Sequence, residues 1–357
     1  MRKISNKAYW CITCVCVVVV LIAISILTIH LDPYFHYHKP IDGISYTLYS
    51  ERYQNDGISR HFEYDTIITG SSMTQNFKTS ECDEIFGVNS IKVPFSGATY
   101  KEVNDNLKRA FQSDNSIKNV IRCLDYSRLA LPADSMNSDV EFPEYMTNDN
   151  LFDDVHYCLN KTIIYGDTLK MIFNTLLNKE NTNFDDYSNT MKYSTFGRQQ
   201  VLESYSLGEK KDVQRVLTDE ETLMIRENIR ENVLKLVEEQ KDTQFYLFFP
   251  PYSICYWDEL NHKGEINWRI QAEKIAIEEL LGIPNINLYS FCDNTELVCN
   301  LDNYKDQAHY GEWINSKILR WMKDGEGLLT EENYLQYIEN IQKIYTSYDY
   351  ESIHMEE

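Results

Sequence analysis

Hydrophobic residues form one long uncharged run near the amino terminus, at residues 8–29. A helix of this length rises about 33 Å, which is enough to cross the hydrocarbon core of a bilayer. No small-residue cleavage site ends the run, so an uncleaved anchor is predicted in preference to a cleaved signal peptide. Basic residues precede the run, which predicts a cytoplasmic amino terminus and an extracytoplasmic remainder at the cell membrane.

After this run, short apolar stretches alternate with amphipathic ones. The apolar stretches predict five strands, at residues 65–69, 91–94, 119–125, 244–249 and 285–291. Helical periodicity predicts helices that include residues 100–112, 163–177, 218–240, 266–281, 309–322 and 331–345. Strands separated by helices indicate an α/β fold. We expect a flavodoxin-like, doubly wound three-layer sandwich with a mainly parallel five-stranded sheet, preceded by the transmembrane helix.

Composition along the chain predicts four segments. Residues 1–30 form the cytoplasmic amino terminus and the anchor, and the aromatic residues and prolines of 31–62 indicate a stalk. Residues 63–325 form the α/β domain, within which the irregular and acidic residues 131–211 are interpreted as an insertion or lid. Residues 326–357 are expected to form a C-terminal helix and an acidic tail.

Net charge and cysteine content limit the partners of this chain. The formal net charge is -21, and the first thirty residues contain three basic and no acidic residues, so the remainder carries about -24. Such a surface repels phosphate backbones, which argues against nucleic acid as a partner. Among nine cysteines, Cys292 and Cys299 flank a short polar loop; a disulfide between them and free buried thiols are both compatible with the sequence. No cluster of ligand residues predicts a metal site, and no cofactor is expected.

A candidate nucleophile follows the first predicted strand, in Gly70-Ser71-Ser72. A serine hydroxyl needs a neighbouring base to take its proton, and a tight turn whose backbone amides face the developing oxyanion. A strand that runs through Gly-Ser-Ser into a helix supplies such a turn. The alternative role for Ser72 is that of a helix-capping serine.

Asp306 and His309 are the candidate partners of Ser72. Their spacing of three places both on one side of a helical turn, with Cβ atoms about 5–6 Å apart. The carboxylate can then hold one ring nitrogen of His309 and leave the other for Ser72, as in a catalytic triad. A capping Asp306 and a surface His309 are the alternatives, but their combination with a serine turn favours the triad. The amides of Ser72 and Gly97 are candidate oxyanion-hole donors.

These motifs resemble those of the SGNH/GDSL hydrolase superfamily, and over roughly residues 64–322 its membrane-anchored envelope branch in particular. That branch includes teichoic-acid D-alanine-transfer proteins and alginate O-acetylation proteins. The likeness rests on Gly70-Ser71-Ser72, the turn glycine Gly97 and Asp306-x-x-His309. It implies that residues 63–325 are an SGNH-like catalytic domain in which Ser72 is the nucleophile.

Two positions depart from the pattern of that superfamily. Ser71 precedes the nucleophile, where Asp is usual, and the third strand ends at Asp125, where the third block usually supplies an oxyanion-hole Asn. A carboxylate there would repel an oxyanion unless it were protonated, and Arg128 is a candidate for compensation. At the same rim, Tyr252 and Tyr304 are candidate substrate contacts, although a core residue and a loop residue would give the same pattern.

Three functions are compatible with these features. One is a serine esterase that removes acyl groups from a cell-envelope polysaccharide or a small acyl ester. Another is an O-acyltransferase with the same acyl-enzyme, for which the resemblance implies a multi-spanning membrane O-acyltransferase as a partner. The third is a catalytically weak or inactive protein that binds glycan or such a partner, which the departure at Asp125 favours. The nucleophile elbow of α/β-hydrolases is disfavoured, because Thr74 occupies the position of its second glycine.

Overall fold

The computed structural model describes residues 5–148, 150–208 and 210–355. Residues 1–4 of the predicted cytoplasmic terminus and 356–357 of the predicted acidic tail lie outside this range. The chain forms two compact units. The first contains the residues up to Phe62 together with Glu141–Asn183, and the second contains the rest. The expected stalk therefore ends at a unit boundary, whereas the expected insertion is shared between the units.

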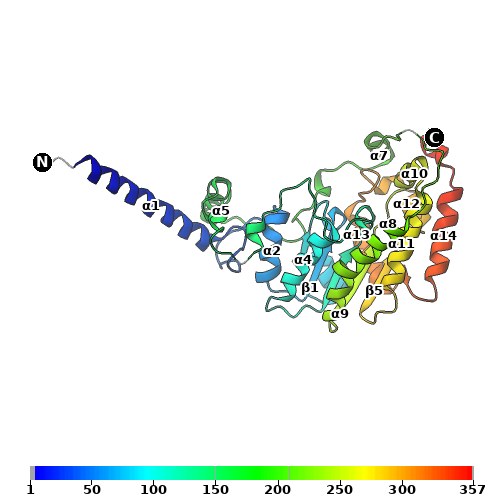
Figure 1. Ribbon diagram of the computed structural model, residues 1–357, viewed down its shortest axis with the longest axis horizontal. Helices are drawn as coiled ribbons and strands as arrows, with labels where there is room; N and C mark the ends of the chain where they lie inside the picture. The colour runs from blue at the N-terminus through cyan, green and yellow to red at the C-terminus, as the bar shows by residue number, and fades with distance from the viewer. Residues whose placement is uncertain (1–4, 149, 209, 356–357) are drawn as a thin grey trace. The chain divides into compact units, whose positions relative to one another are not determined.

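The first unit begins with α1 (Asn6–Leu31), which Figure 1 shows in blue. It is the one helix in the described part of the chain that is long and apolar enough to cross a membrane. Asp32 ends the helix in a left-handed conformation, with φ of 44°. Its carboxylate accepts hydrogen bonds from the amides of His36, Tyr37 and His38, which fixes the turn that follows α1.

The rest of the first unit is a small helical body. Its helical elements are α2 (Glu51–His61), η3 (Glu144–Met146), α5 (Val155–Cys158), the π-helical turn η4 (Ile163–Thr168) and α6 (Leu169–Leu176). Its core consists of Tyr34, Met146, Tyr157, Cys158 and Ile163. Residues expected to form a stalk are thus packed against a segment that lies about a hundred residues later in the chain.

The second unit is built on a six-stranded sheet in the order β2-β1-β3-β4-β5-β6. Its strands are β1 (Thr66–Gly70), β2 (Ser90–Pro94), β3 (Asn119–Cys123), β4 (Gln244–Phe249), β5 (Ile286–Ser290) and β6 (Leu328–Leu329). The first five strands pair in parallel, and β6 pairs antiparallel with β5. The predicted fold class is confirmed, with the two-residue strand β6 as an addition.

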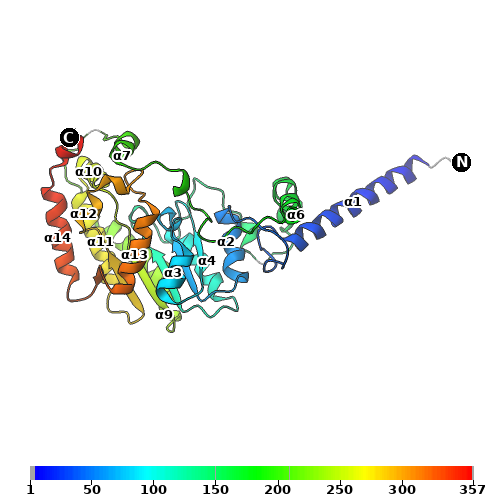
Figure 2. The same cartoon turned by 180° about the vertical axis from the view of Figure 1, so that it is seen from behind.

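Helices cover both faces of this sheet. Figure 1 shows α4 (Tyr100–Phe111), α8 (Asp219–Ile229) and α11 (Ile266–Leu280) over one face. Figure 2 shows α3 (Thr79–Phe86) and α13 (Glu312–Asp324) over the other. Helices on both faces explain why every residue of β1 and β2 is buried.

Shorter helical elements and the C-terminal helix complete the second unit. They are η1 (Ser72–Thr74), η2 (Tyr126–Arg128), η5 (Met191–Tyr193), α7 (Arg198–Ser204), η6 (Arg230–Leu234), α9 (Lys235–Glu239), α10 (Ile254–Lys263), α12 (Thr295–Val298), η7 (Leu301–Asn303), α14 (Tyr334–Ser347) and η8 (Tyr350–His354). The nine cysteines are free thiols in the structure, so Cys292 and Cys299 do not form the disulfide that was considered.

Candidate active site

The candidate side chains gather where the parallel strands end. Ser72 follows β1, Gly97 follows β2 and Asp125 follows β3, and these three strands are neighbours in the sheet. Because the carboxyl ends of parallel strands meet at one edge, residues distant in sequence are brought together there. Among the described residues, no group of three or more His, Cys, Asp or Glu side chains is arranged to hold a metal ion.

Ser72 begins the 3-10 turn η1, two residues after the glycine that ends β1. A Cβ atom at Gly70 would lie 2.8 Å from the Cβ of Cys123 on β3, so only glycine permits this close turn. Ser71 caps η1 by accepting a hydrogen bond from the amide of Met73. The capping role considered for Ser72 therefore falls to its neighbour, and the Ser72 hydroxyl is left for another partner.

That partner is His309. The Oγ atom of Ser72 lies 2.8 Å from Nε2 of His309, and Nδ1 of His309 lies 3.0 and 2.9 Å from the two carboxylate oxygens of Asp306. Burial raises the pKa of Asp306. Hydrogen bonds from the side chain and the amide of His309 lower the pKa by more than burial raises it, so the net pKa is below its usual value. An ionised Asp306 favours a proton on Nδ1, which leaves Nε2 to accept the proton of Ser72.

Asp306 and His309 lie in a loop and not on the helical turn that their spacing predicted. Helix α13 begins only at Glu312, and an isolated antiparallel bridge between Tyr304 and Tyr310 closes the loop. Within it, Oδ1 of Asp306 accepts hydrogen bonds from the amides two and three residues later. These local hydrogen bonds hold the imidazole of His309 next to the carboxylate of Asp306. The predicted contact between the two side chains is therefore present, although the predicted helical backbone is not.

The amides of Ser72 and Gly97 remain candidates for an oxyanion hole. Within the described residues, neither amide donates to a protein acceptor. Gly97 has φ of +66°, which favours glycine, and its carbonyl accepts a hydrogen bond from Nδ2 of Asn137 at 2.9 Å. Nη2 of Arg128 would lie 3.7 Å from a Cβ atom at Gly97. Asn137 was missed because no motif marks it, and it lies in the segment that was interpreted as an insertion.

Both carboxylate oxygens of Asp125, the third oxyanion-hole candidate, accept hydrogen bonds from neighbouring serines. One of its carboxylate oxygens accepts a hydrogen bond from Oγ of Ser71 at 2.7 Å. The other accepts from the amide and the hydroxyl of Ser127, at 3.0 and 2.7 Å. Because its two oxygens accept hydrogen bonds from Ser71 and Ser127, Asp125 links the turn after β1 to the turn after β3.

The two tyrosines predicted to contact substrate are core residues. Tyr252 is 5% exposed and Tyr304 is 0% exposed, and burial raises the pKa of both phenols. The Tyr304 hydroxyl donates to the carbonyl of Pro251 at 2.8 Å, which ties the triad loop to the turn after β4. The structure therefore gives these side chains a supporting role, in line with the alternative that the sequence left open.

A groove of about 320 Å³ is lined by residues of the second unit other than Ser72, Asp306 and His309. Its lining includes Lys78, Asn189, Phe196, Glu312 and Trp313. The rings of Phe196 and Trp313 lie 4.8 Å apart, centroid to centroid, and form an aromatic wall. Glu312 accepts hydrogen bonds from Lys78 at 3.1 Å and from Asn189 at 3.0 Å, so the lining of the groove also has a polar part.

Comparisons with known proteins leave the function of this chain open. No protein-family model matches the sequence, and no curated protein matches it. Among solved structures, the chain is similar to one described as "a putative platelet activating factor from Streptococcus pneumonia". The identity is 9% and the TM-score 0.41, over 77% of this chain and 92% of that chain. At this level the likeness does not identify an activity, so the function must be inferred from the site.

Proposed function

We propose that this protein is a membrane-anchored, extracytoplasmic serine enzyme that cleaves or transfers ester-linked acyl groups of a cell-envelope polysaccharide. The observation that carries this proposal is the hydrogen-bonded series from Ser72 through His309 to Asp306, with distances of 2.8 and 2.9 Å. A hydroxyl, an imidazole and a carboxylate in this order are the parts of a serine nucleophile system. The resemblance to SGNH/GDSL hydrolases and the apolar helix α1 support the same proposal.

The reaction would proceed through an acyl-enzyme. The Ser72 oxygen attacks the acyl carbonyl carbon while its proton passes to Nε2 of His309, and the oxyanion faces the amides of Ser72 and Gly97. The ester C–O bond then breaks, and His309 returns the proton to the departing alcohol oxygen. Water or a second hydroxyl next gives its proton to His309 and attacks the acyl carbon. The bond between the acyl carbon and the Ser72 oxygen then breaks, and His309 returns the proton to that oxygen. Asp306 fixes the imidazole and stabilises its positive charge at each transfer.

A groove lined by aromatic, amide and charged side chains supports a carbohydrate as the alcohol part of the substrate. Flat aromatic faces such as those of Phe196 and Trp313 pack on the apolar faces of sugar rings, and the amide and charged groups in the same lining suit hydroxyls. Transfer and hydrolysis share every step up to the acyl-enzyme. They differ in whether a sugar hydroxyl or water completes the reaction, and a membrane O-acyltransferase is the proposed acyl source for transfer.

A fluorophosphonate probe and p-nitrophenyl acetate test the proposal on the full-length protein in detergent. Labelling and turnover are expected in the parent chain and lost in Ser72→Ala and His309→Ala. Ser352→Ala removes an exposed hydroxyl far along the chain and serves as the matched control that keeps both activities. A parent chain that is neither labelled nor active, although folded, would contradict the enzyme proposal and favour a glycan-binding or partner-binding protein.

A further inference from the structure

Exposed hydrophobic side chains gather in one segment of the first unit, from Leu151 to Leu177. Seven large apolar or aromatic side chains there are between 49% and 92% exposed, namely Leu151, Phe152, Val155, Tyr165, Phe173, Leu176 and Leu177. We refer to these seven side chains as the apolar face. Folding gains nothing from leaving so many apolar groups in water within 27 residues of the chain, so their exposure indicates that this segment has an interaction partner.

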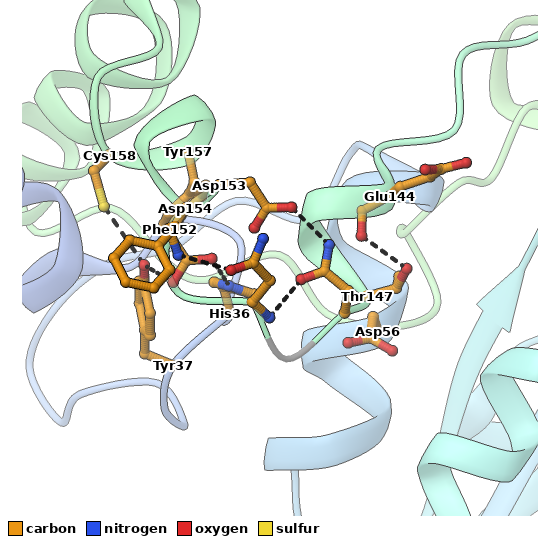
Figure 3. A network of polar contacts seen from close by, with 12 residues as sticks. His36, Tyr37, Asp56, Glu144, Thr147, Phe152, Asp153, Asp154, Tyr157 and Cys158 are labelled. Carbon is orange, nitrogen blue, oxygen red and sulfur yellow. Dashed lines mark hydrogen bonds and ion pairs between the residues drawn. The ribbon is translucent and has the colours of Figure 1, made fainter.

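The acidic and the basic residues of the same segment differ in their exposure to solvent. Its acidic side chains are turned toward the protein, as Figure 3 shows for Asp154, which lies 3.3 Å from Nε2 of His36 and accepts a hydrogen bond from Tyr37 at 2.9 Å. Asp167 is likewise buried and accepts from two tyrosine hydroxyls. Asp153, the third, is bonded to an asparagine amide.

The basic residues of this segment are exposed instead. The two lysines of the segment, Lys161 and Lys170, are both exposed. In a chain with a formal charge of -21, this segment therefore presents a surface that is both apolar and basic. Apolar side chains flanked by exposed lysines are the pattern of segments that lie in the interface of a bilayer, where the lysines meet anionic headgroups.

The apolar face also lies beside the end of the candidate membrane span. Helix α1 contacts α5 and η4, and Figures 1 and 2 show α5 and α6 next to its C-terminal end. On this face of α1, Thr28 and Leu31 are buried and Ile24 is partly buried. Ile24 lies about 10 Å along the helix axis from Leu31. Because residues 8–29 form the apolar run, elements that cover Thr28 and Ile24 reach the level of the membrane surface.

We infer that the apolar face is a membrane-interface surface, with its seven side chains at the headgroup–acyl boundary and the two lysines of the segment among anionic headgroups. Lipid fits this position better than a partner protein because the elements that carry the apolar face are continuous with those that cover the end of α1. This assignment rests on the proposed insertion of α1 into a membrane and does not depend on chemistry at Ser72. It adds a second contact between the first unit and the bilayer.

Tryptophan fluorescence in vesicles with brominated acyl chains tests this inference. The full-length chain is reconstituted into phosphatidylcholine and phosphatidylglycerol, and each variant is compared with the parent chain. Phe152→Trp and Leu176→Trp report on the apolar face, and Ile22→Trp reports on the middle of α1. Val213→Trp is the matched control, because Val213 is 78% exposed but belongs to the second unit.

The added fluorescence is expected to be quenched at positions 152, 176 and 22, and to remain unquenched at position 213. Bromines near the headgroup should quench positions 152 and 176 more than bromines deep in the acyl chain. If the fluorescence at position 22 is quenched while that at positions 152 and 176 remains unquenched, as at 213, the inference is wrong, but the proposal that α1 is a membrane anchor is retained. If position 22 is not quenched, the proposed anchor fails, and the membrane-interface surface fails with it.

Discussion

At the scale of single residues, the proposed chemistry depends on which nitrogen of His309 carries its proton. Asp306 Oδ1 and Oδ2 both lie within 3.0 Å of Nδ1, and an ionised carboxylate there can only accept. In Asp306→Asn, the amide group can donate to the ring and favours the wrong tautomer. We expect kcat for p-nitrophenyl acetate to fall by a factor on the order of 10⁴. Asp324→Asn, an exposed acid at the end of α13, should keep the parent rate; equal rates for both variants would contradict the triad.

The lowered pKa of Asp306 also predicts how its contribution to stability depends on pH. The carboxyl has a usual pKa of 3.8, and the folded value is lower. A group of this kind stabilises the fold above its unfolded pKa, and that contribution is lost as the pH falls through the folded pKa. The difference in unfolding free energy between the parent chain and Asp306→Asn should therefore be present near neutral pH and shrink below pH 3.8. Urea unfolding across this pH range measures it, and a difference that grows on acidification would contradict the assignment.

Residues within short motifs could be predicted, whereas residues that depend on distant neighbours could not. Ser72 and the pair of Asp306 and His309 each belong to a local pattern whose chemistry is readable along the chain. The burial of Tyr304, by contrast, follows from packing against the turn after β4, which no local pattern reveals. Asn137 reaches Gly97 from a separate loop, so its position also depends on the tertiary fold.

At the scale of elements, a buried lysine of β2 supports the segment that follows Ser72. Lys92 is 0% exposed, and its Nζ donates to the carbonyls of Gln75 at 2.5 Å and Phe77 at 2.9 Å. These carbonyls belong to the loop that follows η1. A charged donor in the interior therefore fixes the backbone just beyond Ser72.

Removal of that donor should weaken both the fold and the site. Lys92→Met keeps an unbranched side chain of similar length but leaves two carbonyls without this donor, which should cost about 1–3 kcal/mol of unfolding free energy. Lower kcat with a smaller change in KM is expected, because the loop after Ser72 loses its support. Urea unfolding and ester turnover measure the two effects. Lys108→Met, at an exposed position of α4, is the matched control and should change neither.

The elements themselves were predictable to different degrees. The capping box of Thr218 and Glu221 is present at the start of α8, because both of its hydrogen bonds form between near neighbours. Strand β6 has only two residues and is defined by its pairing with β5. A segment this short has no alternation of apolar and polar residues from which a strand could be predicted. The start of α13 was predicted too early, since the hydrogen bonds of Asp306 hold the preceding residues in a loop.

At the scale of the whole molecule, the sequence placed the α/β fold correctly but did not reveal the first unit. The sheet follows from alternation of strands and helices along the chain, a pattern that needs no knowledge of distant contacts. The first unit combines residues before Phe62 with residues after Glu141, and its core forms between Tyr34 and side chains such as Tyr157. Its aromatic residues therefore looked like those of a stalk until their partners were known.

The orientation of the chain in the membrane is the last prediction, because access to an envelope polymer requires the second unit to lie outside the cytoplasm. Arg2, Lys3 and Lys7 precede the apolar run, and no acidic residue lies in the first thirty, so retention of the amino terminus in the cytoplasm is expected. With an epitope at each end of the chain, protease added to intact expressing cells should remove the C-terminal epitope and spare the N-terminal one. Replacement of the three basic residues by Glu should weaken this asymmetry, since the basic flank sets the orientation. A C-terminal epitope that survives in intact cells but not in lysed cells would place the site on the cytoplasmic side, where an envelope polysaccharide could not reach Ser72.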